Sequence, residues 1–470
     1  MAMWQQKEIQ QPQPPAPEAA VIPLPTRAVA RYPERKPHYL SVRTKFAIAI
    51  SAGAAWLLLS VLLAQPWASA LSGLVGLPLA WVMIAGIALI PGFMNAFMLI
   101  SLAMDQRPAR TPLMRYPGIS ILVAAYNEED NIVSTLDSIA LQNYPGPVEV
   151  IVVNDGSRDR TAELVGANLP HFPWLRLLDL PRNVGKARAL NQALQLVTHD
   201  ITITVDADSW LFRDALSSIV ERYVQDPVST RAVAGAVMVR NSRATWMTRA
   251  QEWDYFQGIA AIKRVQSLYQ GTMVAQGAFS LYDTSTLRDV GGWPDCIGED
   301  IVLSWSILKA GHRVGYCEDA LLFTNAPTTL VQFIRQRRRW SRGMIEAFKQ
   351  HPDILWMGSL PTAFVYWNLL FPFLDLVFTL VFIPGILLAL FGYFWIVGPI
   401  TLALNPMAMA MNYFMYRIGC RMFERLGLRV RFNPSGFFIY SLFYSLIMQP
   451  VSLVGYVSEI LNLRKSWGTK

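Results

Sequence analysis

Cysteine and histidine are scarce in this chain of 470 residues, which contains three Cys and five His. Cys296, Cys317 and Cys420 are too few and too scattered for a disulfide framework or a zinc site. We therefore expect no metal site built from thiolates or imidazoles. A hard cation bound by carboxylates is compatible with the composition.

Charged residues are also few. They make up 16% of the chain, whereas about 25% is typical of soluble proteins. Hydrophobic residues make up 53%, which is enough for a soluble core and several membrane spans. The net charge of +8 is compatible with a nucleic acid, an anionic lipid or an anionic substrate. Because the basic residues cluster near apolar runs and in one Arg-rich segment, we expect no nucleic acid as a partner.

The N-terminal part predicts a tail followed by two membrane spans. Residues 1–44 are rich in Gln and Pro, which is typical of a disordered tail, and no signal-peptide cleavage site follows. Residues 45–64 and 79–102 each supply about 20 mostly apolar residues, enough to cross a hydrocarbon core of roughly 30 Å. They predict two transmembrane helices within 45–104. Basic residues before the first run place the tail in the cytoplasm: Arg27, Arg31, Arg35, Lys36 and Arg43.

The C-terminal part contains three further apolar segments, 364–390, 395–416 and 437–461. They predict about three transmembrane or interfacial helices within 361–461. Arginines between the last two segments place that loop in the cytoplasm. An odd number of spans would put the basic C-terminal tail, 462–470, on the outer side. The alternative is that one segment lies in the interface or is re-entrant.

The region 112–357 between these runs has the pattern of an α/β domain. Short apolar runs rich in β-branched residues predict buried parallel strands, and helical patterns lie between them. The alternation predicts a doubly wound sheet, in which ligands bind beyond the carboxyl ends of the strands. Asp155 and Asp206 fall at those ends. The predicted strands are 119–125, 148–153 and 201–205, and the predicted helices are 131–141, 161–167 and 187–197.

Asp206 and Asp208 directly follow the apolar strand 201–205. Positions i and i+2 of an extended segment point the same way, so both carboxylates can serve one site. Mg²⁺ and Mn²⁺ take oxygen ligands, commonly a few from protein and the rest from phosphate and water. A bare D-x-D is usually a solvated turn. The preceding strand and the accompanying motifs favour a metal site here.

Two further motifs could meet a nucleotide. Asp155 could accept hydrogen bonds from a base or ribose, and Gly156 permits close approach of a ligand. The alternative is an ordinary strand-to-helix turn. Lys186 could bind a phosphate through its positive charge. The alternative interpretation is an ordinary surface lysine at the start of a helix.

Glu299 and Asp300 precede an amphipathic helical pattern. Acidic residues are expected at a helix N-terminus because of the helix dipole alone. A carboxylate here could equally take a proton from an acceptor hydroxyl, and the motif leaves both interpretations open.

The segment Gln336-Arg337-Arg338-Arg339-Trp340 places forked guanidinium donors around one Trp, which suits phosphate. Its alternative is an interfacial helix that binds anionic lipid head groups.

These motifs, in this order, resemble those of processive family 2 glycosyltransferases, the group that contains cellulose, chitin, hyaluronan and poly-β-1,6-N-acetylglucosamine synthases. The resemblance covers residues 119–348 and extends to the spans around them. Four segments are most similar to bacterial poly-N-acetylglucosamine synthases: Val153-Asn154-Asp155-Gly156-Ser157, Gln276-Gly277-Ala278-Phe279, Gly291-Gly292-Trp293 and Gly298-Glu299-Asp300.

Carried over position by position, the resemblance implies a Rossmann-like GT-A fold and Mg²⁺ or Mn²⁺ as cofactor. Asp300 would be the catalytic base, and Asp208 would bind the metal. Acceptor-side candidates are Glu299, Trp293 and Trp340. The donor nucleotide and diphosphate would be bound by Asp155, Lys186, Asp206, Gln336, Arg339 and Trp340.

The sequence departs from the family pattern at two places. Gly298 stands where the family usually has Thr or Ser, and the segment after Phe279 lacks an Arg pair often found there. The first departure does not affect Asp300, the base that the resemblance implies. The second leaves the identity of the acceptor undetermined.

The expected activity is inverting, processive transfer of sugar from a UDP-sugar, UDP-N-acetylglucosamine in the first place, to a growing exported polysaccharide. The alternatives are a glucan- or chitin-type synthase, a non-processive transferase acting on a lipid carrier, and a non-catalytic export scaffold. The expected location is the inner (plasma) membrane, with a cytoplasmic catalytic domain. Membrane lipid and a small membrane or periplasmic export subunit are the expected partners.

Overall fold

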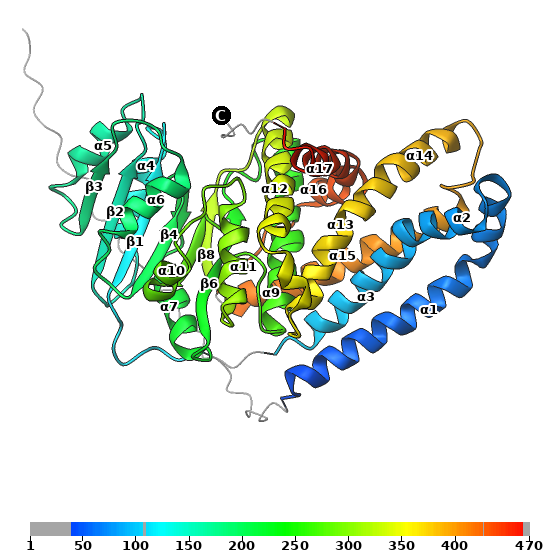
Figure 1. Cartoon of the computed structure of the whole chain (residues 1–470), viewed down its shortest axis with the longest axis horizontal. Coiled ribbons are helices and arrows are strands. Elements are labelled where there is room, and N and C mark those ends of the chain that lie inside the picture. The colour runs from blue at the N-terminus through cyan, green and yellow to red at the C-terminus, as the bar shows by residue number, and fades with distance from the viewer. Residues whose placement is uncertain (1–38, 107–109, 426, 464–470) are drawn as a thin grey trace, which may run out of the picture. The chain divides into compact units, whose positions relative to one another are not determined.

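The computed structural model describes residues 39–106, 110–425 and 427–463. Most of the two predicted tails, residues 1–38 and 464–470, lies outside the described residues. The described residues from Ser41 onward form one compact unit. Within this unit, Figure 1 shows a β-sheet with its covering helices on one side and long apolar helices on the other.

The N-terminal helices form an antiparallel pair. Ser41 Oγ accepts the Thr44 N–H at 3.1 Å and caps α1 (Val42–Val75), so this helix starts inside the predicted tail. Gly76, at φ 82°, ends it. The chain then returns through α2 (Leu77–Ile84), the π-helix η1 (Ala85–Leu89) and α3 (Ile90–Ala103). Pro91 has no N–H for the preceding turn, which accounts for the local π-helix.

The sheet has eight strands in the order β3-β2-β1-β4-β7-β6-β8-β5. The first four are parallel, which confirms the predicted α/β half. Because β7 is antiparallel to both neighbours, the sheet is mixed rather than parallel throughout. The strands are β1 (Ile119–Ala125), β2 (Val148–Asn154), β3 (Leu175–Asp179), β4 (Ile201–Val205), β5 (Ser209–Leu211), β6 (Thr230–Val239), β7 (Phe279–Asp283) and β8 (Arg313–Thr324).

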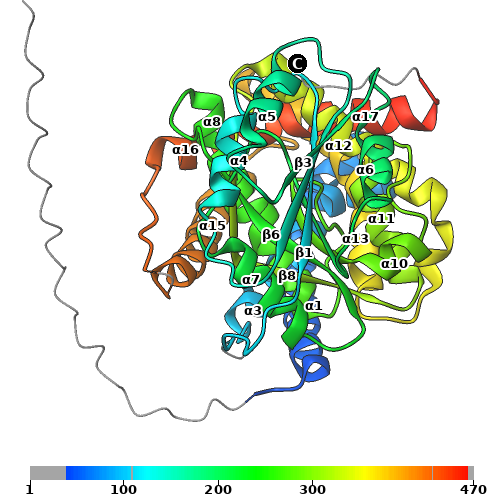
Figure 2. The same cartoon turned by 90° about the vertical axis from the view of Figure 1, so that its left-hand side faces the viewer.

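Helices cover both faces of the sheet (Figure 2). Successive side chains of β1 point to opposite faces of the sheet. Ile121 and Val123 pack into one hydrophobic core, and Leu122 packs into the other. One face is covered by α4 (Ile132–Ala140), α5 (Thr161–Asn168) and α7 (Ala215–Gln225). The other is covered by α6 (Lys186–Leu194), α10 (Thr284–Asp289) and α11 (Glu299–Lys309).

A second group of helices connects this α/β domain to the apolar helices. Their bounds are α8 (Trp246–Trp253), the π-helix η2 (Asp254–Ala261), α9 (Ile262–Leu268), α12 (Leu330–Gln350) and the 3-10 helix η3 (Pro352–Trp356). The C-terminal helices are α13 (Thr362–Val377), the π-helix η4 (Phe378–Phe382), α14 (Ile383–Leu390), α15 (Pro399–Arg425), α16 (Pro434–Ile439), the π-helix η5 (Tyr440–Tyr444) and α17 (Ser445–Ile460).

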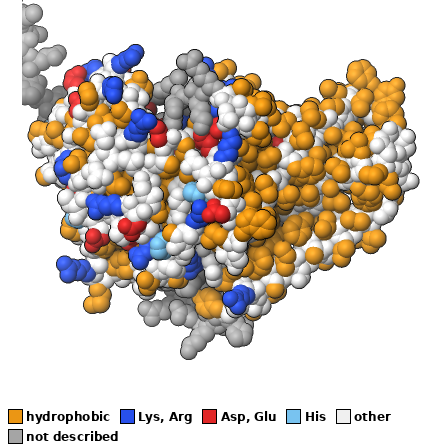
Figure 3. Space-filling view, in the orientation of Figure 1, with side chains coloured by type: hydrophobic (Ala, Val, Ile, Leu, Met, Phe, Trp, Pro, Cys, Tyr) orange, Lys and Arg blue, Asp and Glu red, His pale blue; other side chains and the backbone are white. Residues whose placement is uncertain are grey.

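Four helices in the described part of the chain are long and apolar enough to cross a membrane: Val42–Val75, Leu77–Ala103, Thr362–Leu390 and Pro434–Ile460. Figure 3 shows the corresponding contrast, with hydrophobic side chains covering the long helices and charged side chains on the α/β domain. These features indicate a membrane protein. By the same measure of length and composition, α15 is not among the four candidates.

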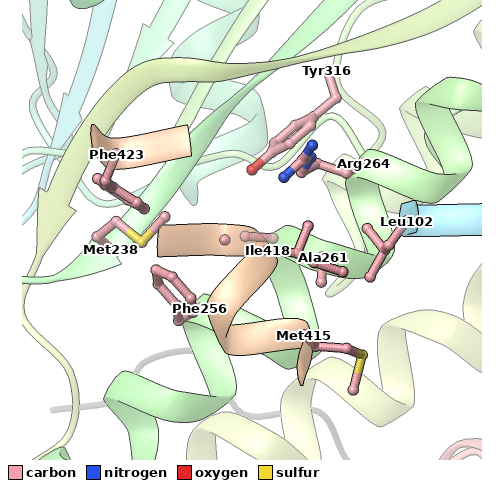
Figure 4. Close-up of a pocket in the computed structure, with 11 residues that line it drawn as sticks. Leu102, Met238, Phe256, Ala261, Arg264, Tyr316, Met415, Ile418 and Phe423 are labelled. Atoms are coloured by element: carbon pink, nitrogen blue, oxygen red, sulfur yellow. The ribbon is translucent and has the colours of Figure 1, made fainter. Parts of the chain in front are cut away.

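The helix α15 connects the far end of the apolar helices to the α/β domain. Just before it, the Trp395 carbonyl accepts a hydrogen bond from Trp67 Nε1 in the C-terminal half of α1, at 2.9 Å. Near its other end, Phe423 stacks on Phe256 of η2, with ring centroids 5.6 Å apart. Figure 4 shows Phe423, Ile418 and Met415 of α15 facing the apolar pocket at this junction.

The segment from α16 to α17 contacts the connecting helices at both ends and in between. The Asn433 carbonyl accepts a hydrogen bond from Trp253 Nε1 at 2.9 Å, just before α16. At the other end, Glu459 forms an ion pair of 3.0 Å with Arg342 of α12. One turn before Glu459, a Cβ on Gly455 would lie 2.0 Å from Ser341 Oγ, so α17 packs closely on α12. This candidate span therefore lies along α12.

Candidate active site

The chain order of the sheet creates a switch point between β1 and β4. The chain runs from β1 to β2 and β3 in one direction, and β4 then pairs with the other edge of β1. The carboxyl ends of β1, β2 and β4 meet at the same edge, where a doubly wound sheet binds its ligands. Asp155 and Asp206 follow β2 and β4 at this edge, as the sequence predicts.

Asp155 is buried and holds the loop that precedes α6. Its two carboxylate oxygens accept the N–H groups of Val184, at 2.7 Å, and Gly185, at 3.0 Å. Burial raises the pKa of Asp155, and these two donors partly oppose the shift. Gly156 has φ +64°, and a Cβ there would lie 2.4 Å from the Arg182 carbonyl carbon. The two loops therefore meet backbone to backbone, and contact of Asp155 with a uridine stays a prediction.

Lys186 and Asp206 are brought together by that loop. Gly185, at φ +92°, precedes the first residue of α6, and Lys186 Nζ lies 2.5 Å from Asp206 Oδ1. Burial lowers the pKa of Lys186, but the carboxylates of Asp206 and Glu299 outweigh it and raise the pKa overall. The lysine therefore carries its charge at the carboxyl end of β4, where a phosphate would need it.

Asp300 reaches the same place from the first turn of α11. Its Oδ2 accepts the Gly277 N–H at 3.3 Å, and its Oδ1 accepts the Ile301 N–H at 2.8 Å. A Cβ on Gly277 would lie 3.1 Å from Lys186 Nζ and 3.6 Å from Glu299 Oε1. Glycine at this position therefore lets the lysine and both acidic side chains approach one another.

Glu299 has a strongly perturbed carboxyl group. Burial and the neighbouring Asp300 raise the pKa of Glu299 to about 7, while Lys186 and Arg339 oppose the shift. Perturbed groups of this kind are concentrated at functional sites. Arg339 of α12 is therefore near enough to this carboxyl group to act on it electrostatically.

Gly298 brings α11 against α12. A Cβ on Gly298 would lie 2.6 Å from the Gly343 Cα atom, and the Gly298 N–H donates to Glu346 Oε2 at 2.9 Å. A Thr or Ser at position 298 would meet backbone rather than a flexible side chain. The departure from the family pattern at this position therefore has a packing reason.

Asp208 is suited to a divalent cation. Burial, Asp206 and Glu128 together raise the pKa of Asp208 to about 6, so negative charge is concentrated around it. Its Oδ1 accepts long hydrogen bonds from the hydroxyls of Thr324, at 3.4 Å, and Ser209, at 3.5 Å. No group of three or more His, Cys, Asp or Glu side chains that could hold a metal occurs among the described residues. The donor set fits a hard cation that takes its other ligands from phosphate and water.

In the arginine-rich motif, residues 336–340, some side chains pack inside the protein and others are available to the site. Arg337 is 2% exposed and lies 2.8 Å from Asp254 of η2, with its guanidinium 4.0 Å from the ring centre of Trp340. Trp340 keeps 38% of its surface exposed. Gln336 Oε1 is buried without a hydrogen-bond partner among the described residues, which leaves it able to accept a bond from a ligand.

The structure thus gathers most of the predicted site residues and separates one from them. Trp293 is 2% exposed, and its ring packs edge-on against Tyr282 while its backbone bonds to Asn191 of α6. The buried ring offers no face to an acceptor, so Trp293 has no place in the site proposed below. Lys263, a buried lysine of α9 whose charge interacts with Asp300, was not among the predicted site residues. Nothing in the sequence around Lys263 indicates that its side chain is buried.

Comparison with known proteins identifies the family of this domain. Residues 120–291 match the model of glycosyl transferase family 2. Together with the mixed sheet, this match shows that the chain carries a GT-A-like glycosyltransferase domain of family 2. This domain is the one that the sequence resemblance predicted.

The names of similar proteins are more specific than the description of the family. The poly-beta-1,6-N-acetyl-D-glucosamine synthase of Staphylococcus aureus strain MSSA476 is 36% identical over 227 residues, which is 48% of this chain and 54% of the relative. The synthase of the same name from Staphylococcus epidermidis is 35% identical over the same shares. The chain thus spans about half the length of the curated relatives it matches.

A solved structure shares the fold. The mannosyltransferase PcManGT from Pyrobaculum calidifontis, in complex with GDP-Man and Mn²⁺, has a TM-score of 0.56 and 21% identity. The match covers 82% of this chain and 99% of that chain. At this identity the likeness supports the fold alone.

Proposed function

We propose that this protein is a membrane-bound, inverting and processive glycosyltransferase that polymerises sugar from UDP-N-acetylglucosamine into an exported β-linked polysaccharide. The named activity of the staphylococcal relatives supports the donor and the product. The observation that carries the proposal is the meeting of Lys186, Asp206 and Asp300 around Gly277. Nucleotide-phosphate binding and proton removal would both take place there.

Asp300 is the proposed catalytic base. Two backbone N–H groups already fix its carboxylate, so little reorganisation is needed when a hydroxyl approaches. The acceptor hydroxyl attacks C1 of the donor sugar opposite the leaving UDP and gives its proton to Asp300. The new glycosidic bond forms as the C1–O bond to the diphosphate breaks, which inverts the configuration without a covalent enzyme intermediate.

The leaving diphosphate needs positive charge and hydrogen-bond donors. Lys186 and Arg339 supply both, and the unpartnered Oε1 of Gln336 would accept a hydrogen bond from a hydroxyl of the donor. Asp155 and Asp206 would contact the nucleotide. A Mg²⁺ or Mn²⁺ ion at Asp208 would neutralise diphosphate charge as a Lewis acid.

The acceptor would lie beside Trp340 and Glu299. The exposed indole of Trp340 is fixed by Arg337 and lies 6.3 Å from the Tyr255 ring, so it can present an apolar face to a sugar. Glu299, with its pKa near neutrality, can donate or accept a hydrogen bond to the terminal sugar. The linkage follows from which hydroxyl this pocket presents to Asp300.

We further propose the topology of the chain in the inner membrane. Four crossings would be made by α1, by α2 to α3, by α13 to α14 and by α15. The segment from α16 to α17 would lie in the interface along α12, because its ends at Asn433 and Glu459 both contact the catalytic domain. This arrangement keeps the catalytic domain and the last described residues on the cytoplasmic side. It also agrees with the arginines in the loop before α16.

The proposed function is tested by donor turnover in sealed inverted membrane vesicles with Mg²⁺ or Mn²⁺. UDP-N-acetylglucosamine is compared with UDP-glucose, and D300N serves as the blank. Polymer of high molecular mass from the first donor alone is expected. Polymer from UDP-glucose would make the protein a glucan synthase, and a single sugar on lipid would make it a lipid-linked transferase. Release of UDP from neither donor would contradict the proposal.

A further inference from the structure

Lys263 is a buried cation that the reaction above does not use. It lies in α9 with 7% of its surface exposed, and its Nζ donates a hydrogen bond to the carbonyl oxygen of Val274. A buried ammonium group is destabilising unless it is paired and hydrogen-bonded. When it is protonated, Lys263 therefore needs a negatively charged group nearby.

The segment that accepts this bond, residues 274–278, also orients the proposed base. The Ala275 N–H donates to Ser304 Oγ at 2.7 Å, and that hydroxyl donates to the Asp300 carbonyl oxygen at 2.6 Å. Two residues later, the Gly277 N–H donates to the Asp300 carboxylate. A side chain that fixes the start of this segment therefore acts on the position of the base.

The charge of the lysine acts on the same carboxylate. Burial lowers the pKa of Lys263 to about 7, and the Asp300 carboxylate opposes this shift. The other titratable groups that interact with Asp300 are Lys186 and Glu299 at the site and Tyr282 of β7. Lys186 lies 2.5 Å from Asp206, so its charge is shared between two carboxylates.

The other charged groups near α9 are engaged elsewhere. Arg264 pairs at 2.8 Å with Asp105, which directly follows α3. On η2, Asp254 pairs with Arg337 of α12. Consecutive residues of α9 therefore connect it to α3 on one side and to the catalytic segment on the other.

We propose that Lys263 is a positioning residue for Asp300. It fixes residues 274–278 through the Val274 carbonyl, and with them the Gly277 N–H that the Asp300 carboxylate accepts. The proposal rests on the proposed function, in which Asp300 accepts the proton of the acceptor hydroxyl. Its consequence is that loss of the lysine displaces the base and lowers kcat more than it changes the donor KM.

The first test compares two buried side chains of the same helix. K263M keeps the apolar stem and removes the charge. Q266L is the matched control, because Gln266 is also buried and its Oε1 accepts the Met273 N–H at 3.1 Å, just before Val274. Both variants loosen the same turn, but only the first removes a charge beside Asp300.

The expected result is a change in kcat with little change in the donor KM. In K263M, kcat for UDP release falls at least about tenfold while the donor KM changes less than about twofold. K263R keeps a donor for the Val274 carbonyl and restores most of kcat, and Q266L keeps kcat within about threefold of the wild type. An unchanged kcat in K263M, no rescue by K263R, or an equal fall in Q266L overturns the proposal.

A second test needs no activity. Thermal unfolding in nanodiscs is measured for K263M, D300N and the double variant. The effects of the two substitutions are expected to be non-additive, whereas those of Q266L and D300N add. Additive effects of K263M and D300N overturn the proposal. If the wild type turns over no donor, the proposed function fails, and this cycle still decides whether Lys263 is coupled to Asp300.

Discussion

The Asp254 carboxylate lies 2.8 Å from the Arg337 guanidinium and joins the π-helix η2 to α12. The Tyr444 hydroxyl donates to the same carboxylate at 2.8 Å, so the segment from α16 to α17 is held at this point as well. The guanidinium stacks on Trp340, the ring proposed to meet the acceptor. One ion pair thus connects three helical segments to the acceptor side of the site.

We expect the loss of one partner of this pair to destabilise the protein. D254N leaves the Arg337 charge buried and unpaired, which should cost about 3 kcal/mol of unfolding free energy. The double variant D254L/R337M should be closer to the wild type, because two apolar side chains leave no buried charge. The control is R188M, which removes the exposed pair with Asp295 and should change little. Thermal unfolding in detergent measures all three, and a D254N variant as stable as R188M would contradict the expectation.

The second prediction concerns the base. D300N keeps an oxygen that can accept the Gly277 N–H but cannot take a proton from the acceptor. We expect kcat to fall at least about 100-fold, with UDP affinity within about twofold of the wild type. D295N, at an exposed position on the preceding loop, is the control and should retain activity. Polymer synthesis by D300N would remove Asp300 from the role of base.

The third prediction concerns the metal. EDTA should stop UDP release, and Mg²⁺ or Mn²⁺ should restore it. D208N removes one carboxylate charge and should raise the Mn²⁺ concentration needed for half-maximal activity at least about tenfold. Mn²⁺ binding in the presence of UDP, followed by electron paramagnetic resonance, gives a readout independent of turnover. Synthesis that resists EDTA, with unchanged Mn²⁺ binding in D208N, would refute the assignment of Asp208.

The fourth prediction concerns the contact between α11 and α12. G298T places a side chain 2.6 Å from the Gly343 backbone, which cannot move without shifting α12. We expect a loss of about 1–3 kcal/mol in unfolding free energy, the usual cost of overpacking. G166A is the control, because its Cβ would meet nothing within 4 Å in α5 and Ala favours helix over Gly. A G298T protein as stable as G166A would show that the two helices have room to separate.

The sequence predicts those parts of the site that depend on local pattern. Asp206 and Asp208 follow a strand of β-branched residues, and a strand's carboxyl end is where such a sheet binds ligands. The site at Asp300 could be predicted only through the resemblance, because acidic residues at a helix N-terminus have a local explanation.

Contacts between distant segments could not be predicted in this way. Lys263 and Asp254 acquire their roles only when α9 and η2 pack against α11 and α12. Hydropathy likewise selects Pro434–Ile460 as a span, but its ends bond to the catalytic domain. Composition reports whether a helix can enter lipid, and it does not report which neighbours the helix has.

The last prediction tests the proposed topology. Single cysteines are introduced at three exposed positions, F391C after α14, S435C in the first turn of α16 and N462C after α17, with Cys420 replaced by Ser. We expect F391C to react with a membrane-impermeant maleimide added to intact cells. S435C and N462C should react only when the membrane is opened, because both ends of Pro434–Ile460 lie on the catalytic side in the proposed arrangement.

The control for the cytoplasmic side is E163C, on the exposed surface of α5 in the catalytic domain. Like S435C and N462C, it should stay unlabelled in intact cells, in which F391C is labelled. If the segment crossed the membrane instead, S435C and N462C would lie on opposite faces, and one of them would label from outside. If S435C were the one that labels, α15 would be the interfacial helix, with four crossings and the last described residues on the cytoplasmic side. If N462C were the one that labels, α15 and Pro434–Ile460 would both cross, which gives five crossings and places the last described residues outside the cell. The labelling of F391C relative to S435C decides whether α15 crosses, because these two positions flank it.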